Sequence, residues 1–363
     1  MRQYAHSHRR RPTRGPVVRV AQELRGLATP AIVGAAGARP IRWMRVRRWA
    51  ARGLVPMLAL GGLGWLAWRA WPQITSERWH IDPAPVAVGF GLYTVTLLAA
   101  AFLWHQIVVR LAGAHPFWRG ARVYAIAMLA RRLPGGPWSQ ASRVLMYRDA
   151  GYPWGLPVSA SALELGASGL AGLCLSASLL ALQPGLLPAA GWIGAGVIAL
   201  VSLASLYPPA LNRALSIFGR VVKEDLASPS TYGPLAVAGW IANAALIWLL
   251  GGIVLYCVVV ALTPNPPSLL PVVRSWVIAG TAGLASVFLP SGLGLFEFAL
   301  ATLLSADLPP STAVASTLAM RVLTTAVDAF WATLAWRIGG LTRLEAADRE
   351  RRTQDCSSSG RAG

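Results

Sequence analysis

The sequence predicts an all-α protein: a polytopic bundle of six to eight membrane-spanning helices, some of them broken by Pro and Gly or re-entrant. Three observations predict this class. The 363 residues are 55% hydrophobic and only 13% charged, against about 25% charged residues in soluble domains. Several apolar runs reach roughly 20 residues, the length that crosses about 30 Å of hydrocarbon. The connections between the runs alternate between basic and neutral, as the positive-inside rule requires.

Six apolar runs are long enough to span a bilayer, at 54–72, 84–109, 156–182, 188–207, 234–262 and 311–336. Two further apolar stretches, 117–148 and 271–307, are interrupted by Pro and Gly. The chain crosses the membrane six times if 271–307 is a re-entrant hairpin. It crosses eight times if that stretch spans twice, as 271–289 and 295–307.

The distribution of charge divides the chain into three segments. Residues 1–53 hold thirteen Arg against the single acid Glu23 and predict a basic cytoplasmic tail that is disordered or lies on anionic lipid. Residues 54–337 form the transmembrane domain, and 338–363 form a short cytoplasmic tail. The connection between the second and third spans is also basic, with Arg110, Arg119, Arg122, Arg131, Arg132, Arg143 and Arg148 against Asp149 alone.

This charge pattern predicts a multi-pass protein with both termini in the cytoplasm. The chain has one lysine, Lys223, and otherwise uses Arg, which indicates the GC-rich genome of a bacterium and hence the bacterial cytoplasmic membrane. Aromatic residues are not interleaved with the basic tail as they are in single-strand binding proteins. We therefore expect membrane lipids, and no nucleic acid, as partners.

Metal, cofactor and nucleotide chemistry have no support in the sequence. The cysteines Cys174, Cys257 and Cys356 are far apart, and the five histidines show no ligand spacing. No GxxxxGK[ST] phosphate loop is present. We expect no metal, no cofactor and no catalytic residue, so the protein is not expected to be an enzyme.

Two helix breaks are the most specific local signals. The first contains Pro134, Gly135, Gly136 and Trp138, and the second contains Pro290, Gly292 and Gly294 before Glu297. Pro removes a backbone donor, and backbone broken at membrane depth must be buried in protein or face a watery cavity. Because the two breaks enter from opposite sides in this topology, they predict an inverted repeat with a binding site near the midplane.

These motifs resemble the transmembrane, flippase-like region of the lysylphosphatidylglycerol synthase family. A basic residue before a Pro-Gly-Gly-x-Trp break is present as Arg131 or Arg132, Pro134, Gly135, Gly136 and Trp138, and a Pro-x-Gly-x-Gly-x-x-Glu element is present as Pro290, Gly292, Gly294 and Glu297. The resemblance spans most of 50–340 and implies a flippase-like domain at 54–337. Pro137 and Phe296, the latter where an Arg is expected beside the Glu, depart from the family pattern. We expect the synthase half of the family to be absent, so the resemblance implies lipid translocation and not aminoacyl transfer.

Charged residues inside apolar runs are the candidate ligands of a lipid headgroup, because a charge at the bilayer centre costs about 2.5–3.5 kcal/mol and usually faces a cavity or a partner. The candidates are Arg131, Arg132, Glu164, Arg274, Glu297, Arg321 and Asp328. Arg321 and Asp328 share one polar stripe of the last span but are about 10 Å apart, so each should meet a group on another helix. The alternative is a salt-bridge network that only fixes helix packing, with Glu297 also suited to its helix N-terminus.

The sequence favours a translocator of a phospholipid or lipid-linked headgroup. One alternative is a membrane-embedded lipid-modifying enzyme, which would need clustered His, Asp or Ser residues. Another is a structural or assembly partner that recruits a separate lipid synthase through its basic tail. Deletion of residues 1–45 tests the assembly-partner hypothesis against the others. The measurement is whether function, or only complex formation, is lost. The lipid, the coupling ion and the oligomeric state are left open.

Overall fold

The computed structural model describes residues 81–113, 115–132, 138–182, 233–285 and 295–359, together with the single residues 68, 72, 79 and 196. Every element in these ranges is a helix: α3 (Pro83–Ala112), α4 (Phe117–Ala130), α5 (Trp138–Asp149), α6 (Gly155–Ala181), α9 (Pro234–Leu262), α10 (Leu269–Ala285), α11 (Leu295–Leu304) and α12 (Pro310–Ser359). The predicted all-α class is confirmed. Apart from those single residues, the predicted spans 54–72 and 188–207 and the basic tail 1–53 lie outside the described residues.

Four described helices are long and apolar enough to cross a membrane: α3, α6, α9 and the Pro310–Ile338 part of α12. They match the predicted runs 84–109, 156–182, 234–262 and 311–336 to within a few residues. The protein is therefore an integral, multi-pass membrane protein. The last helix continues beyond the predicted span to Ser359, so most of the segment predicted as the C-terminal tail is helical.

Each interrupted stretch is a pair of shorter helices. The stretch 117–148 contains α4 and α5, and 271–307 contains α10 and α11. The ten residues of α11 extend about 15 Å, half of the roughly 30 Å of hydrocarbon. This length favours the re-entrant hairpin over the double crossing.

The helices begin and end where the chain supplies capping groups. The amide of Ala84 donates to the Asp82 carboxylate over 2.9 Å at the start of α3, and Pro83 follows Asp82 as a first helical residue that lacks an amide donor. At the other end of α3, Gly113 has a φ of +79°, which glycine adopts without steric cost. Its amide donates to the Val109 carbonyl over 2.9 Å, and the chain turns there toward α4.

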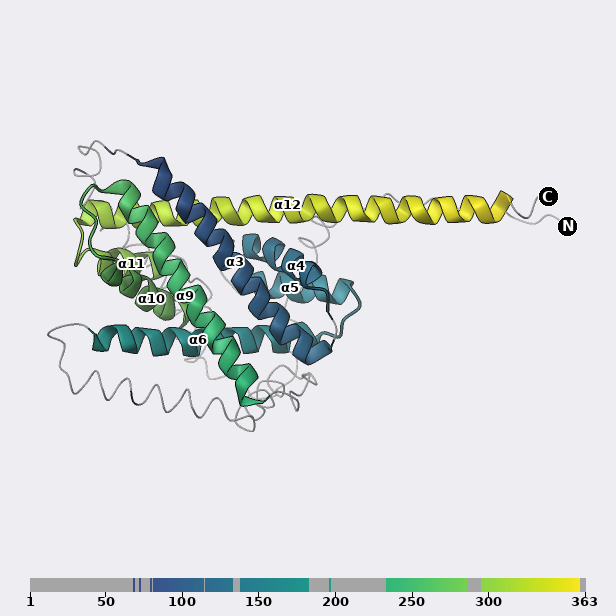
Figure 1. Ribbon diagram of the computed structural model, residues 1–363, viewed down its shortest axis with the longest axis horizontal. Helices are drawn as coiled ribbons and strands as arrows, with labels where there is room; N and C mark the ends of the chain where they lie inside the picture. Colours follow the sequence, from purple (N-terminus) through teal and green to yellow (C-terminus); the bar gives the residue numbers. More distant parts are fainter. Residues whose placement is uncertain are drawn as a thin grey trace, which may run out of the picture. The chain divides into compact units, whose positions relative to one another are not determined.

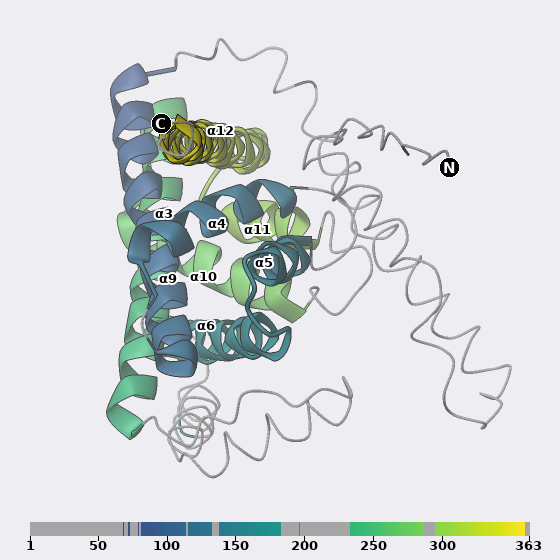
Figure 2. The same cartoon turned by 90° about the vertical axis from the view of Figure 1, so that its right-hand side faces the viewer.

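The long helices α3 and α9 pack along one another and form one wall of the bundle (Figures 1 and 2). The short helices lie on one side of this wall, with α4 packed against α12, and α10 packed against α9, α6 and α11. One apolar cluster lies where α3, α4, α5, α6 and α9 meet, around Trp104, and a second lies among α3, α9, α10, α11 and α12, around Leu255. The short helices are thus packed against the long ones.

The apolar and polar faces of α12 are reversed relative to a helix of a soluble protein. Large apolar side chains are exposed, among them Leu318, Val322 and Phe330, whereas Thr324 and Asp328 are buried. Lipid is the solvent that suits such an outer face, because it cannot hydrogen-bond a polar one. The polar residues of the last span therefore face the interior of the bundle.

Two tryptophans pack into notches left by glycines on neighbouring helices. The ring of Trp248 (α9) occupies the space where Gly172 (α6) and Gly280 (α10) have no side chain, and the ring of Trp276 (α10) lies against Gly251 (α9). The indole N–H of Trp248 donates to the Ser168 carbonyl over 3.0 Å. Small residues allow such close helix approach in membranes, so α6, α9 and α10 are joined through these notches.

Gly280→Ala is expected to destabilise the protein by about 1–3 kcal/mol, because the added Cβ would overlap the Trp248 ring. Gly91→Ala is the matched control, since nothing lies within 4 Å of a Cβ at that helical position. The control should leave stability unchanged or raise it by up to about 1 kcal/mol. Thermal unfolding of both variants in detergent measures the difference, and equal midpoints would contradict the packing.

Candidate functional site: a charged cavity inside the bundle

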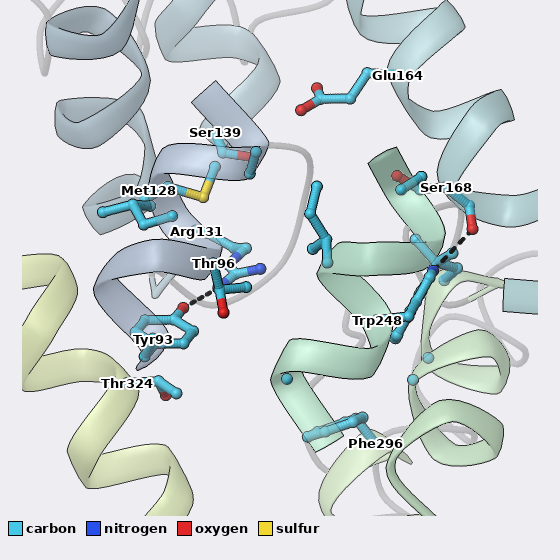
Figure 3. A pocket seen from close by; sticks show the side chains of 18 of the residues that line it. Tyr93, Thr96, Met128, Arg131, Ser139, Glu164, Ser168, Trp248, Phe296 and Thr324 are labelled. Atoms are coloured by element: carbon cyan, nitrogen blue, oxygen red, sulfur yellow. Dashed lines mark hydrogen bonds between the residues drawn. The ribbon is translucent and has the colours of Figure 1, made fainter. Parts of the chain in front are cut away.

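A cavity of about 460 Å³ lies within the described bundle. Its lining comes from all eight described helices or the residues directly beside them. Figure 3 shows Tyr93, Thr96, Arg131 and Thr324 on one side of it and Trp248 and Phe296 on the other. The cavity therefore has one wall rich in polar groups and one rich in aromatic rings.

Described residues that flank the two predicted helix breaks line this cavity. Arg131 and Arg132, before the first break, and Ser139, after it, are lining residues. Leu284 and Phe296, on either side of the second break, are lining residues as well. The break residues Pro134, Gly135, Gly136, Pro290, Gly292 and Gly294 lie outside the described residues. Trp138 is the first residue of α5.

Arg321 and Glu297 form an ion pair at the cavity. The Arg321 guanidinium bonds the Glu297 carboxylate, joining α12 to the first turn of α11. Both residues line the cavity, together with Thr317 and Thr324 of α12. The prediction that Arg321 meets a group on another helix is confirmed.

Asp328 joins α12 to the end of α4. Its carboxylate is fully buried and accepts from Arg132 Nε over 2.9 Å and from Arg132 Nη2 over 2.5 Å. Arg131 approaches the same carboxylate only to 3.9 Å and donates instead to the Tyr93 hydroxyl over 3.1 Å. The Tyr93 hydroxyl of α3 donates to the other oxygen of Asp328 over 3.3 Å, so Asp328 also meets another helix, as predicted.

Arg143 is a cavity residue that the sequence did not single out. Its side chain is only 1% exposed, and Nη1 lies 2.6 Å from the Glu164 carboxylate. Tyr124 donates to the other oxygen of Glu164 over 2.8 Å, and the guanidinium lies 4.1 Å from the centre of the Trp104 ring. Glu164 was predicted as a candidate, but Arg143 was assigned to a cytoplasmic connection.

Arg274 is not among the lining residues, in contrast to its prediction as a headgroup ligand. It lies on α10 and pairs with Asp307 over 3.6 Å, beyond the end of α11. The prediction rested on Arg274 lying within an apolar run. Its charge is met by an acid in the connection that follows α11, and its role as a headgroup ligand stays a prediction.

The aromatic wall is formed by α9, α10 and α11. Trp276 and Phe296 meet edge to face with ring centres 5.4 Å apart, and both line the cavity with Trp248. Phe296 is the residue at which the resemblance noted in the sequence led us to expect an Arg. This departure gives the cavity an apolar contact beside Glu297.

His115 lies outside the spans, in the connection between α3 and α4, and packs against rings of the apolar cluster around Trp104. Its ring stacks on Tyr147 at 5.5 Å, and the Tyr147 hydroxyl accepts a bond from the Trp104 indole over 2.9 Å. Burial, followed by the nearby His105 and Arg119, lowers the pKa of His115. The folded protein therefore favours the neutral imidazole.

Stability is expected to fall as the pH is lowered through about 6.5, the ordinary histidine value, toward the lower folded pKa of His115. In that interval the unfolded chain binds a proton that the folded chain excludes. His115→Phe keeps a ring against Tyr147 and should weaken this pH dependence. Melting temperatures measured between pH 8 and pH 5 test the expectation, and identical slopes for the two proteins would contradict it.

Among the described residues, no group of three or more His, Cys, Asp or Glu side chains is arranged to hold a metal ion. The chemistry of the described site is that of arginines, carboxylates, hydroxyls and aromatic rings.

Residues 49–332 match the family model described as the lysylphosphatidylglycerol synthase TM region. The match covers more than half of the chain and includes the cavity residues described above. No curated protein matches the chain.

Proposed function

Because the chain belongs to the lysylphosphatidylglycerol synthase TM region family, we propose that it moves a phospholipid or a lipid-linked headgroup across the bacterial cytoplasmic membrane. Both termini face the cytoplasm in this proposal. The observation that carries it is the cavity, at which four arginines and two glutamates gather inside a bundle with an apolar exterior.

Charged side chains inside an apolar membrane bundle are energetically unfavourable. Each costs a few kcal/mol to bury unless it meets a partner or a watery cavity. A network that only fixed packing would have no need of a cavity at its centre, whereas a transport pathway requires one. The guanidinium group is suited to phosphate, since its planar fork donates two hydrogen bonds at once.

The two walls of the cavity match the two parts of a lipid. Arginines and hydroxyls on α3, on α12 and just after the end of α4 suit a phosphate headgroup, and the rings of Trp248, Trp276 and Phe296 suit glycerol and hydrocarbon. The paired helix breaks support an inverted-repeat transporter, in which broken helices flank the substrate site. The residues beside both breaks line this cavity.

Reconstitution into liposomes tests the proposal. Purified protein is incorporated into vesicles that contain a trace of NBD-labelled phospholipid, and dithionite destroys the label exposed on the outer leaflet. Transport makes the protected inner-leaflet label accessible, with or without an imposed proton gradient. Protein-free vesicles and vesicles with heat-denatured protein are the controls, and a quenching trace identical to theirs under every gradient would refute the proposal.

A further inference from the structure

From the charge balance of the cavity, we infer that its ligand is a lipid whose headgroup carries a net negative charge, and that Arg131 binds its phosphate. This inference rests on the proposed function and narrows it. The family name points to a lysyl lipid, whose two amino groups exceed the single phosphate charge and make the headgroup cationic. The described residues favour the opposite sign.

Three of the four lining arginines are matched by carboxylates. Arg321 pairs with Glu297, Arg143 with Glu164 at 2.6 Å, and Arg132 with Asp328 at 2.5 Å. Each pairing joins two different described elements, and each carboxylate is buried. Within each pair the positive and negative charges compensate each other. These three arginines therefore have little need of a further charged partner.

Arg131 is the fourth arginine, and the described residues offer it no carboxylate of its own. Its nearest acid is Asp328 at 3.9 Å, and the nearer oxygen of that acid already receives both bonds from Arg132. The hydroxyl of Tyr93, at 3.1 Å, supplies a dipole rather than a compensating charge. The described cavity residues, with Asp328 behind them, therefore hold one positive charge in excess.

The position of Arg131 suits an incoming anion. Its side chain is 52% exposed while that of Arg132 is 19% exposed, and Figure 3 shows Arg131 beside Thr96 and Tyr93 at the cavity. A phosphodiester brings one negative charge and oxygens that accept two parallel bonds from a guanidinium. A cationic headgroup would add to the excess, and like charges in a medium of low dielectric repel strongly.

The aromatic wall distinguishes a lipid from a free anion. Trp248, Trp276 and Phe296 add apolar surface to the same cavity as Arg131, and inorganic phosphate would leave that surface unused. The site is therefore expected to discriminate by headgroup charge at one wall and to require an apolar moiety at the other.

Binding measured without transport tests the inference. The purified protein in neutral detergent is titrated with phosphatidylglycerol (net charge −1), phosphatidylcholine (neutral), lysylphosphatidylglycerol (net charge +1) and sodium phosphate, with thermal stabilisation as the readout. Phosphatidylglycerol should bind at least about tenfold more tightly than each of the others, the difference expected for a charge-assisted hydrogen bond. Equal or tighter binding of the neutral or cationic lipid would overturn the inference, as would inorganic phosphate binding as tightly as phosphatidylglycerol.

Arg131→Gln should abolish the preference for phosphatidylglycerol. The exposed Arg110→Gln removes the same charge from the end of α3 and should keep the preference. Arg131→Lys retains the charge but loses the two parallel hydrogen bonds of the guanidinium, so it should keep the order of preference with weaker binding. This variant also tests the assignment if Arg131→Gln does not fold. Retention of the full preference by Arg131→Gln, or its loss in Arg131→Lys, would overturn the assignment to Arg131.

The two proposals fail separately. A protein that binds phosphatidylglycerol selectively but moves no lipid would refute the transport function and leave the anionic site. A protein that moves NBD-phosphatidylglycerol and NBD-phosphatidylcholine equally, and binds both equally, would refute the anionic site and leave transport.

Discussion

Arg143→Leu is expected to lower the free energy of unfolding by about 3–5 kcal/mol, the cost of removing one member of a buried ion pair. The substitution leaves the Glu164 carboxylate buried, with the Tyr124 hydroxyl as its one remaining partner among the described residues. It also removes the guanidinium that lies against the Trp104 ring. Thermal or denaturant unfolding in detergent measures the loss.

The double variant Arg143→Leu, Glu164→Leu distinguishes the cost of leaving a buried charge unpaired from the cost of changing the side-chain packing. Because both charges are then gone, this variant should recover most of the stability lost in the single one. Arg274→Gln is the control, since it breaks a longer ion pair outside the cavity lining and should cost about 1 kcal/mol or less. A single variant as stable as the control would show that the Arg143 pair does not hold α5 to α6.

Arg321→Ala is expected to reduce lipid transport by about 10- to 100-fold while the protein remains folded. The side chain lines the cavity and bonds Glu297, and a hydrogen bond to a charged group contributes about 1.5–3 kcal/mol, which corresponds to that range of rates. The dithionite assay in proteoliposomes measures the rate, and size-exclusion chromatography with thermal unfolding verifies the fold.

Glu297→Gln is the matched variant, because it removes the other charge of the same pair and keeps the shape of the side chain. If the pair only fixed packing, both variants would lose stability and keep their rate per folded molecule. If the pair belongs to the pathway, the rate falls in the folded fraction. Arg321→Ala with an unchanged transport rate would exclude the Arg321–Glu297 pair from the transport pathway.

The long spans were predictable because their signal is local. The runs that became α3, α6, α9 and the apolar part of α12 are uninterrupted, and lipid requires such continuity wherever backbone crosses hydrocarbon. The polar stripe on α12 was predictable for a similar reason, since residues three and four apart share a helix face. Arg321 and Asp328 of this stripe each bond a different element, because they are too far apart along the helix to pair with each other.

Pairing across the bundle was not predictable in the same way. Arg143 lies among Ser, Gln and Tyr in a helix too polar to be read as a span, so it resembled a residue of a basic loop. Its burial depends on Glu164, 21 residues away on a different helix. Arg274 illustrates the same limit, because an apolar sequence around a charge does not reveal whether a neighbouring connection supplies an acid such as Asp307.

The bond between Arg132 and Asp328 has a consequence for biosynthesis. The two residues are 196 positions apart in the chain, and ribosomes add about 5–20 residues per second. Arg132 therefore exists for roughly 10–40 s before its counter-ion has been made. During that interval its charge must remain near the aqueous boundary, and the end of α4 can take its final depth only once the last span has entered the membrane.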